Sequence, residues 1–490
     1  MLGESSEAFQ SSHAAFLFPS VAALYLIIEW TLRIVMLFYV PHRKTPAAAR
    51  TWLLFIFFLP VVGVLLYAWF GRIYLPKKRH ELHGRAATFV RRATHQWNTR
   101  WPLQKREVPP LVHHTTKLVE RLGEFAPLGG NAVELLDEYD TAILRLIGDI
   151  DAAEHHIHLL YYIIADDAVG RKVVEALGRA VRRGVACRVL MDYLGSRPGL
   201  THLAPVMTGM GIEVSAMLPV GMFRAKAARF DLRNHRKIVV IDGQVGYIGS
   251  QNLVISEFKP GLIFEDLVAR VEGPVVSQLQ VTFLADRYCE VESEIGGEGL
   301  FPMIKPAGSV TAQLLPSGPG YTGASVQHLV VALIHDAEKR IVITTPYFVP
   351  DEPLLQALQT AVMSGVEVHL ILPHERDQFL VGFAQQSFYE ELLECGVRIH
   401  LYKPRFLHAK HMSIDDSIAV VGSSNVDIRS FALNSEVSLV IYDKEIVQRQ
   451  RAIEARYLES CDELTLEEWN KRSFMLRAFQ NMCRLVDSFL

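Results

Sequence analysis

Two stretches of this chain carry the same polar residues at the same spacing. Both follow the pattern H-x-K-x4-D-x6-G-x-x-N, in the segments NHRKIVVIDGQVGYIGSQN and LHAKHMSIDDSIAVVGSSN. The residues concerned are His235, Lys237, Asp242, Gly249 and Asn252 in the first stretch, and His408, Lys410, Asp415, Gly422 and Asn425 in the second. A lone His-x-Lys pair carries almost no information. A pattern that recurs without slippage in two places indicates a catalytic constellation.

The residue types in this pattern suit the chemistry of a phosphodiester. The two lysine ammonium groups and the two asparagine amides can hold non-bridging oxygens and stabilise the charge that develops on a five-coordinate phosphorus. One histidine can attack phosphorus while the other protonates the leaving oxygen, through a phosphohistidine intermediate. This scheme requires no metal and no other cofactor. Asp242 and Asp415 fit a structural role in turns at least as well as a chemical one.

The local pattern around each histidine predicts how these groups meet. The residues after each histidine are β-branched and apolar, which predicts a strand with the histidine and lysine on one face. Asp242-Gly243 is a strong signal for a tight turn, and Asp415-Asp416 is a weaker one. We therefore expect the chain to return as a hairpin that ends in Gly-Ser-x-Asn, with the asparagine amide beside the histidine and lysine.

The elements that flank the two motifs are repeated as well. From Ile143 and again from Leu329, the sequence predicts a helix, a buried strand, a loop with paired acids, a second helix and a second strand. Strand, helix and strand at this spacing indicate parallel pairing in an α/β fold. We expect two similar α/β domains, residues 131–300 and 301–490, packed as a pseudo-dimer around one cleft, with residues 76–130 as a linker or lead-in segment. The second domain ends in an amphipathic helix, which either docks on the protein core or lies on a membrane.

The first 75 residues have the composition of a membrane anchor. Residues 51–71 carry no charge and are numerous enough for a transmembrane helix. Residues 16–40 are also apolar, with Glu29 and Arg33 spaced to form a helix-packing ion pair. A signal peptide fits poorly because the N-terminal region is acidic, so we expect two transmembrane helices and a multi-pass protein of the plasma (inner) membrane. The lysines and arginines near these segments favour a cytoplasmic catalytic region.

Charge and cysteine content argue against several other classes of protein. The net charge is −3, and we find no track of basic and aromatic residues, so a nucleic-acid partner is not expected. The five cysteines form no CxxC pair, which favours a reducing compartment over a disulfide framework or a zinc cluster. A basic cluster near the first motif is either a solvated face or a patch for anionic lipid headgroups, and it comprises Arg224, Lys226, Arg229, Arg233 and Arg236. The sequence leaves the oligomeric state open.

The duplicated motif resembles that of the phospholipase D superfamily over residues 130–490. This resemblance implies one active site built from both copies and a covalent phosphohistidine, with His235 as the nucleophile and His408 as the acid and base. In that superfamily, a carboxylate downstream of each motif histidine orients its imidazole. The matching positions are Asp266, in FEDLVARVEGP, and Glu436, in LNSEVSL.

Two further segments are similar to segments of bacterial cardiolipin synthases: TPYFVPDE from Thr345 and DIRSFALNSE from Asp427. Together with the membrane anchor, this resemblance implies transfer of a phosphatidyl group between two phosphatidylglycerol molecules, which gives cardiolipin and glycerol. A phospholipid hydrolase or another phosphatidyltransferase would use the same residues with a different acceptor. A non-catalytic lipid-binding scaffold is disfavoured because the histidine, lysine and asparagine are intact in both copies.

Overall fold

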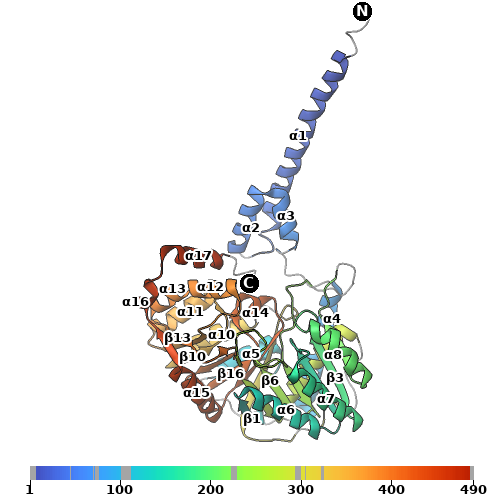
Figure 1. Cartoon of the computed structure of the whole chain (residues 1–490), viewed down its shortest axis with the longest axis vertical. Helices are drawn as coiled ribbons and strands as arrows, with labels where there is room; N and C mark the ends of the chain where they lie inside the picture. Colours follow the sequence, from blue (N-terminus) through green and yellow to red (C-terminus); the bar gives the residue numbers. More distant parts are fainter. Residues whose placement is uncertain are drawn as a thin grey trace, which may run out of the picture. The chain divides into compact units, whose positions relative to one another are not determined.

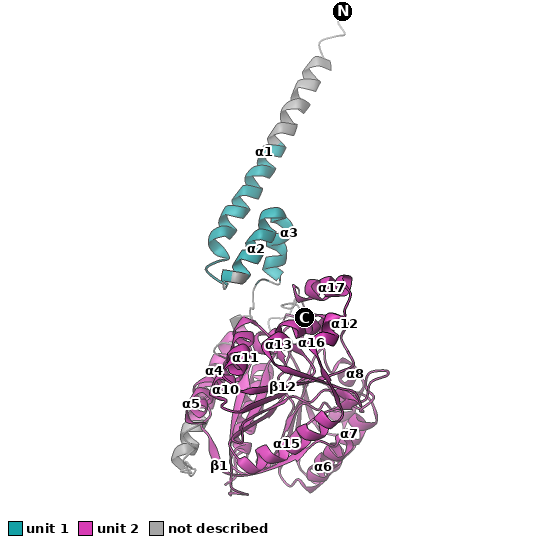
Figure 2. Cartoon of the chain, turned by 90° about the vertical axis from the view of Figure 1, so that its left-hand side faces the viewer, with its two compact units in different colours: residues 1–74 teal, residues 75–490 magenta. Residues whose placement is uncertain are grey.

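The chain divides into two compact units, Met1–Tyr74 and Leu75–Leu490, which we call the N-terminal unit and the main unit (Figure 2). The computed structural model describes residues 7–44, 46–69, 71, 77–100, 112–221, 229–292, 299–303, 305–321 and 325–485.

The N-terminal unit consists of helices α1 (Glu7–Tyr39), α2 (Pro46–Phe58) and α3 (Pro60–Trp69). Among the described residues, one stretch of helix is both long and apolar enough to cross a membrane. It is the part of α1 from Val21 to Tyr39, with 19 residues and a mean hydropathy of 1.9. The structure therefore contains one candidate membrane span where the sequence predicted two.

The second predicted span, residues 51–71, is broken at Leu59. Pro60 lacks the N–H that would continue α2, and its ring clashes with a preceding carbonyl. The chain folds back at this point, so that a Cβ at Gly63 would lie 2.8 Å from the Cα of Ile56 (Figure 1). With 13 and 10 residues, α2 and α3 are about 20 and 15 Å long, which is shorter than a hydrocarbon core of about 30 Å.

Arg33 holds this fold-back against α1. Its Nη1 donates to Oε2 of Glu29 at 3.1 Å, and its Nε donates to the carbonyl oxygen of Phe57 at 3.1 Å. Phe57 is in the last turn of α2, where carbonyl groups lack partners within the helix. The pair of Glu29 and Arg33 thus has the helix-packing role that the sequence suggested.

The main unit is built on one large mixed sheet. Within its described residues, fifteen strands lie in the order β19-β13-β12-β10-β15-β16-β18-β9-β1-β8-β6-β5-β2-β3-β4. Their bounds are β1 (Leu128–Leu136), β2 (His156–Tyr161), β3 (Ala186–Asp192), β4 (Glu213–Met217), β5 (Ile238–Ile241), β6 (Val245–Gly249), β8 (Val268–Glu272), β9 (Val310–Ser317), β10 (Arg340–Thr344), β12 (Glu367–Pro373), β13 (Arg398–Tyr402), β15 (His411–Ile414), β16 (Ile418–Gly422), β18 (Glu436–Ile441) and β19 (Cys461–Leu464). Two small sheets pair β7 (Phe264–Glu265) with β14 (Phe406–Leu407) and β11 (Phe348–Val349) with β17 (Val426–Asp427).

The two halves of the sheet share one topology. The order β1-β8-β6-β5-β2-β3-β4 in the first half matches β9-β18-β16-β15-β10-β12-β13 in the second. The parallel pairs β2–β3 and β10–β12 and the hairpins β5–β6 and β15–β16 occur as the sequence predicted. Antiparallel pairing of β1 with β9 joins the halves into one continuous sheet.

Helices cover both faces of this sheet. They are α4 (Lys77–Arg100), α5 (His113–Gly123), α6 (Tyr139–Ala152), α7 (Ala168–Arg182), α8 (Arg197–Gly209), α9 (Val276–Val291), α10 (Ser325–Asp336), α11 (Glu352–Met363), α12 (Phe379–Ser387), α13 (Tyr389–Cys395), α14 (Ile428–Ala432), α15 (Lys444–Glu459), α16 (Leu466–Asn470) and α17 (Phe474–Arg484). Successive side chains of β2 point to opposite faces of the sheet and so pack in different hydrophobic cores. Leu159 packs with α6 and α7, and Leu160 packs with α4 and α9. Because α4 belongs to this core, part of the expected linker is packed structure.

The C-terminal helix α17 docks on α12 and also exposes apolar side chains. The ring of Phe479 lies 6.1 Å from that of Phe379 and 5.1 Å from that of Phe383. Phe474 and Met475, in contrast, are 81% and 76% exposed. The helix therefore has the core contact that the sequence suggested and also an apolar face that no described residue covers.

Candidate active site

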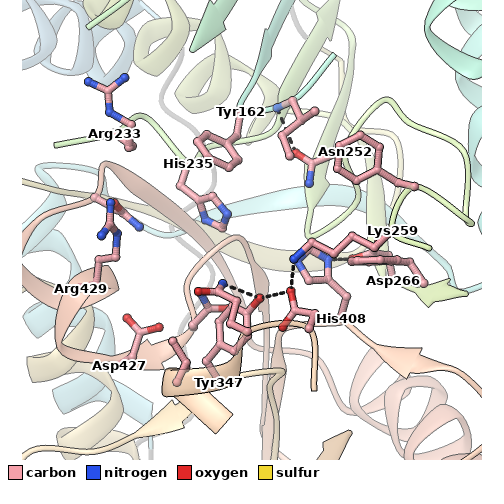
Figure 3. A pocket seen from close by; sticks show the side chains of 18 of the residues that line it. Tyr162, Arg233, His235, Asn252, Lys259, Asp266, Tyr347, His408, Asp427 and Arg429 are labelled. Carbon is pink, nitrogen blue, oxygen red and sulfur yellow. Dashed lines mark hydrogen bonds and ion pairs between the residues drawn. The ribbon is translucent and has the colours of Figure 1, made fainter. Parts of the chain in front are cut away.

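A cavity of about 440 Å³ lies in the main unit, and both motif histidines line it (Figure 3). Side chains from both halves of the sheet form its wall. They are Tyr139, Tyr162, Ile163, Arg233, His235, Asn252, Val254, Phe258, Lys259, Phe264 and Asp266 from the first half, and Tyr347, Val349, Asp377, Gln378, Val381, His408, Asn425, Asp427, Arg429 and Asn434 from the second. The structure thus brings the two motifs to one cavity.

His235 is held by residues of the opposite half. Its Nδ1 lies 3.0 and 3.1 Å from the two carboxylate oxygens of Glu436, and its backbone N–H donates to the carbonyl oxygen of Ser435 at 2.9 Å. The Tyr162 ring packs edge-on at 4.8 Å. With Nδ1 bound to the carboxylate, Nε2 is the ring nitrogen that can reach a substrate.

His408 has the reciprocal arrangement. Its Nδ1 lies 2.7 Å from Oδ1 of Asp266, and its backbone N–H donates to the carbonyl oxygen of Glu265 at 2.8 Å. The sequence placed each carboxylate beside the histidine that precedes it in the chain. The structure corrects this pairing, because each carboxylate orients the histidine of the other half.

The two motif lysines are buried, and neither is among the side chains that line the cavity. Lys237 and Lys410 donate from Nζ to the carbonyl oxygens of their own motif histidines, at 2.7 and 2.6 Å. Burial, together with the smaller effect of the charge of Lys410, lowers the pKa of Lys237 to about 7. Burial likewise lowers the pKa of Lys410 to about 8, although Asp266 and Glu436 oppose this shift. Two buried cations, one of which lowers the pKa of the other in this way, favour the binding of an anion.

The two carboxylates remain ionised in spite of their burial. Burial opposes ionisation of Glu436, but the charge and hydrogen bond of His235 hold the pKa of Glu436 below its usual value. Ser423 strengthens this effect by donating from Oγ to Glu436 at 2.5 Å. His408 acts in the same way on the pKa of Asp266. Burial lowers the pKa of His235 to about 4, so its imidazole is neutral near pH 7.

The hairpins bring the asparagines to the cavity as the sequence predicted. Asn252 and Asn425 follow β6 and β16, and both line the cavity. Oδ1 of Asn252 accepts from the backbone N–H of Ile163 at 3.2 Å, which leaves its amide N–H groups for a ligand. The histidine and lysine of each motif precede β5 and β15 rather than lying within them, because the residues at the histidines cross to the opposite half.

Asp242 and Asp415 have a structural role in the turns of the two hairpins. The carboxylate of Asp242 accepts from the backbone N–H groups of Glu154, His155 and His156, each at 2.8 Å. Asp415 binds the three backbone N–H groups that begin at Glu338, at 2.8–2.9 Å. Both aspartates have a positive φ, of 53° and 48°. Neither lines the cavity, so the structure supports the turn alternative over a chemical role.

No group of three or more His, Cys, Asp or Glu side chains that could hold a metal ion occurs in the described parts of the chain.

Comparison with known proteins agrees with this geometry. A family model described as "Cardiolipin synthase, PLD-like domain" matches residues 146–287 and 330–456, one match in each half of the main unit. A model described as "Phospholipase D-nuclease N-terminal" matches residues 22–72. The chain belongs to the cardiolipin synthase family of the phospholipase D superfamily.

Relatives within this family match nearly the whole chain. Cardiolipin synthase A of Proteus mirabilis is 34% identical over 487 residues, which cover 95% of this chain and 96% of the relative. Cardiolipin synthase A of Pectobacterium atrosepticum is 32% identical and covers 94% of this chain and 98% of its own length. Among solved structures, the phosphatidylserine synthase of Haemophilus influenzae Rd KW20 covers 78% of this chain and all of its own, with a TM-score of 0.57 and 15% identity. That likeness shows a shared fold.

The basic cluster near the first motif does not form a headgroup patch in its described part. Arg236 is fully buried and pairs with Asp286 at 2.5 Å, and Arg233 pairs with Asp192 at 3.2 Å. Arg229 pairs with its neighbour Asp231. The remaining members, Arg224 and Lys226, lie outside the described residues.

In this member of the cardiolipin synthase family, several polar and charged side chains of the cavity were not predicted from the sequence. Lys259 pairs with Asp377 at 2.6 Å, and the Tyr347 hydroxyl donates to the same carboxylate at 2.6 Å. Asp427 and Arg429 lie in the wall on the side of Arg233 (Figure 3). Tyr347 and these last two residues belong to the segments TPYFVPDE and DIRSFALNSE, so the family resemblance of those segments was the available signal.

Proposed function

We propose that this enzyme is a phosphatidyltransferase that converts two phosphatidylglycerol molecules into cardiolipin and glycerol. Membership of the cardiolipin synthase family supports the reaction class. The observation that carries the mechanism is that two histidines line one cavity and that each is paired with a carboxylate of the other half.

In the first step, Nε2 of His235 attacks the phosphorus of one phosphatidylglycerol. A P–N bond forms while the bond from phosphorus to the glycerol oxygen breaks, and His408 gives its proton to that oxygen. Glycerol leaves, and the phosphatidyl group stays on His235. Asp266, 2.7 Å from Nδ1 of His408, stabilises the imidazolium that is needed for this proton transfer.

In the second step, a glycerol hydroxyl of another phosphatidylglycerol takes the phosphatidyl group. His408 removes the hydroxyl proton as the oxygen attacks phosphorus, and the P–N bond breaks. Cardiolipin leaves with His235 neutral and His408 protonated again, so the cycle closes. Water in place of the second lipid would give phosphatidic acid, which is the hydrolase alternative.

The lysines and asparagines of both motifs bind the non-bridging oxygens in this scheme. An incoming phosphate raises the pKa values of Lys237 and Lys410 again, because each gains an opposite charge. The two cations therefore stabilise the negative charge that develops on phosphorus.

We further propose that the enzyme acts at the inner membrane, with α1 as a membrane span and the main unit in the cytoplasm. The apolar stretch Val21–Tyr39 supports the anchor. The basic residues that follow the N-terminal unit support the orientation, because positive charge is retained on the cytoplasmic side.

The test uses the purified full-length protein in detergent with phosphatidylglycerol as the sole lipid. We expect cardiolipin and glycerol in equal amounts, and neither from His235→Ala or His408→Ala. Phosphatidic acid without cardiolipin would make the protein a hydrolase, and absence of turnover with every donor lipid tried would favour a lipid-binding scaffold.

The division of labour between the histidines is tested by acid quenching during turnover. We expect mass spectrometry to find the phosphatidyl group on the peptide of His235. A modified peptide containing His408 would reverse the two roles.

A further inference from the structure

The two ends of the cavity differ chemically although the two halves of the fold repeat. The residue two positions before each motif histidine is Phe406 near His408, but it is Arg233 near His235. The positions two and four residues after each motif asparagine are Val254 and Ser256 in the first half, and they are Asp427 and Arg429 in the second half. Arg233 and the aspartate and arginine near it in the wall thus have no charged counterparts at the equivalent positions of the other half, which are Phe406, Val254 and Ser256.

Arg429 is distinguished from the other cations of the cavity wall by its partners. Arg233 pairs with Asp192 at 3.2 Å, and Lys259 pairs with Asp377 at 2.6 Å. Arg429 donates from Nη2 to the backbone carbonyl of Asp231 at 3.1 Å, and no carboxylate of the described residues lies within 4.0 Å of it. A half-buried guanidinium with several N–H groups left over is suited to a bidentate contact with a phosphate.

Asp427 adds a hydrogen-bond acceptor at the same end of the cavity. Its Oδ1 accepts from the backbone N–H of Ser430 at 2.6 Å as the N-cap of α14, and its side chain lines the cavity. Burial raises the pKa of this carboxyl group to about 6, so it is ionised at neutral pH. A carboxylate oxygen of this kind accepts readily from a hydroxyl group.

We propose that Arg429 and Asp427 form a subsite for the headgroup of the acceptor lipid. Arg429 binds the phosphodiester of the second phosphatidylglycerol, and Asp427 accepts a hydrogen bond from its glycerol. This inference rests on the proposed function and names the residues that select a lipid acceptor over water.

The chemistry of the product explains why a second anion site is needed. The two lysines serve the phosphorus that reacts, whereas the acceptor lipid brings a second phosphate that does not react. Only a glycerol bridge separates the two phosphates of cardiolipin, so the same cavity must hold both. Glycerol and water carry no phosphate and gain nothing from Arg429. The subsite does not depend on which histidine carries the phosphatidyl group, because the cavity holds both imidazoles.

The experiment compares three products of the same intermediate in the full-length enzyme. Cardiolipin measures transfer to a lipid, incorporation of labelled glycerol into phosphatidylglycerol measures transfer to glycerol, and phosphatidic acid measures transfer to water. Ratios of these products are independent of the amount of folded enzyme.

We expect Arg429→Gln to lower the ratio of cardiolipin to labelled phosphatidylglycerol at least tenfold. Arg429→Lys should lower this ratio less, because lysine keeps the positive charge but cannot make a bidentate contact with the phosphate. Asp427→Asn keeps the N-cap, and we expect it to lower both transfer products relative to phosphatidic acid. The exposed Arg449→Gln on α15 is the matched control and leaves every ratio unchanged.

Equal losses of all three products in Arg429→Gln would overturn the subsite while leaving the proposed function intact. A wild-type enzyme that forms no cardiolipin would instead reject the proposed function.

Discussion

At the scale of single residues, the exchange of carboxylates between the halves makes the two histidines interdependent. Glu436 lies in the second half of the main unit but orients the imidazole of His235 in the first half. Asp266 lies in the first half and orients the imidazole of His408 in the second. Neither half of the main unit can therefore prepare its own histidine for chemistry.

We expect Glu436→Gln to lower kcat about 10–100-fold, the range seen when a carboxylate that orients a working imidazole is removed. The amide still accepts from Nδ1 but no longer stabilises positive charge on the ring. Steady-state kinetics with phosphatidylglycerol measure this, with the exposed Glu445→Gln as the control. Activity within twofold of wild type would show that His235 does not need the charge.

The lysine pKa values predict an early alkaline limit. Lys237 and Lys410, with pKa values of about 7 and about 8, lose their charges as the pH rises through this range. The pH dependence of kcat/KM reflects the ionisation of groups in the free enzyme, so we expect kcat/KM to fall above pH 7 to 8. The neutral His235, with a pKa of about 4, imposes no loss between pH 5 and 7. A kcat/KM that stays level up to pH 10 would contradict this prediction.

At the scale of elements, the turn aspartates connect each motif hairpin to the neighbouring strand. Three backbone N–H groups at the start of β2 bind Asp242, and three at the start of β10 bind Asp415. These bonds fix the turn of each hairpin against the neighbouring strand.

We expect Asp242→Asn and Asp415→Asn each to lower the free energy of unfolding by about 1–3 kcal/mol, since an amide oxygen replaces a carboxylate that binds three backbone N–H groups. The midpoint of thermal unfolding measures this loss. The ratio of cardiolipin to phosphatidic acid remains as in wild type, and a changed ratio with unchanged stability would restore a chemical role for these residues.

The exposed face of α17 predicts a contribution to membrane contact. Phe474 and Met475 are largely exposed, and α17 packs on α12, whose Val381 lines the cavity. We expect the double variant Phe474→Ser, Met475→Ser to raise KM for phosphatidylglycerol in mixed micelles several-fold with little change in kcat. An unchanged KM would assign α17 to core docking alone.

The sequence predicted the elements better than their partners. The repeated motif, the parallel strand pairs and the hairpins follow from periodicity and turn residues, which are local signals. The exchange of Asp266 and Glu436 depends on which surfaces of the halves meet, and no local pattern records that. The break at Leu59 was missed because apolar length alone indicated a span, although Pro60 and Gly63 were both present.

At the scale of the whole molecule, the sheet joins the halves through β1 and β9. Separation would expose both strands as unpaired edges and deprive each histidine of its carboxylate. We expect residues 75–300 and 301–490, expressed separately, to form no cardiolipin and to aggregate. Co-expression is the matched control, since it can restore the β1–β9 pair. Cardiolipin formation by either half alone would contradict a shared site.

The fold-back at Leu59 leads us to expect an odd number of membrane crossings. A chain that crosses once through α1 and then turns back within α2 and α3 has its two ends on opposite faces of the bilayer, whereas two complete crossings would leave both ends on one face. Under the proposed cytoplasmic placement of the main unit, we expect the acidic N-terminal residues on the outer side of the membrane. A cysteine introduced ahead of α1 would react with an impermeant reagent in intact cells, and one introduced on α15 would not.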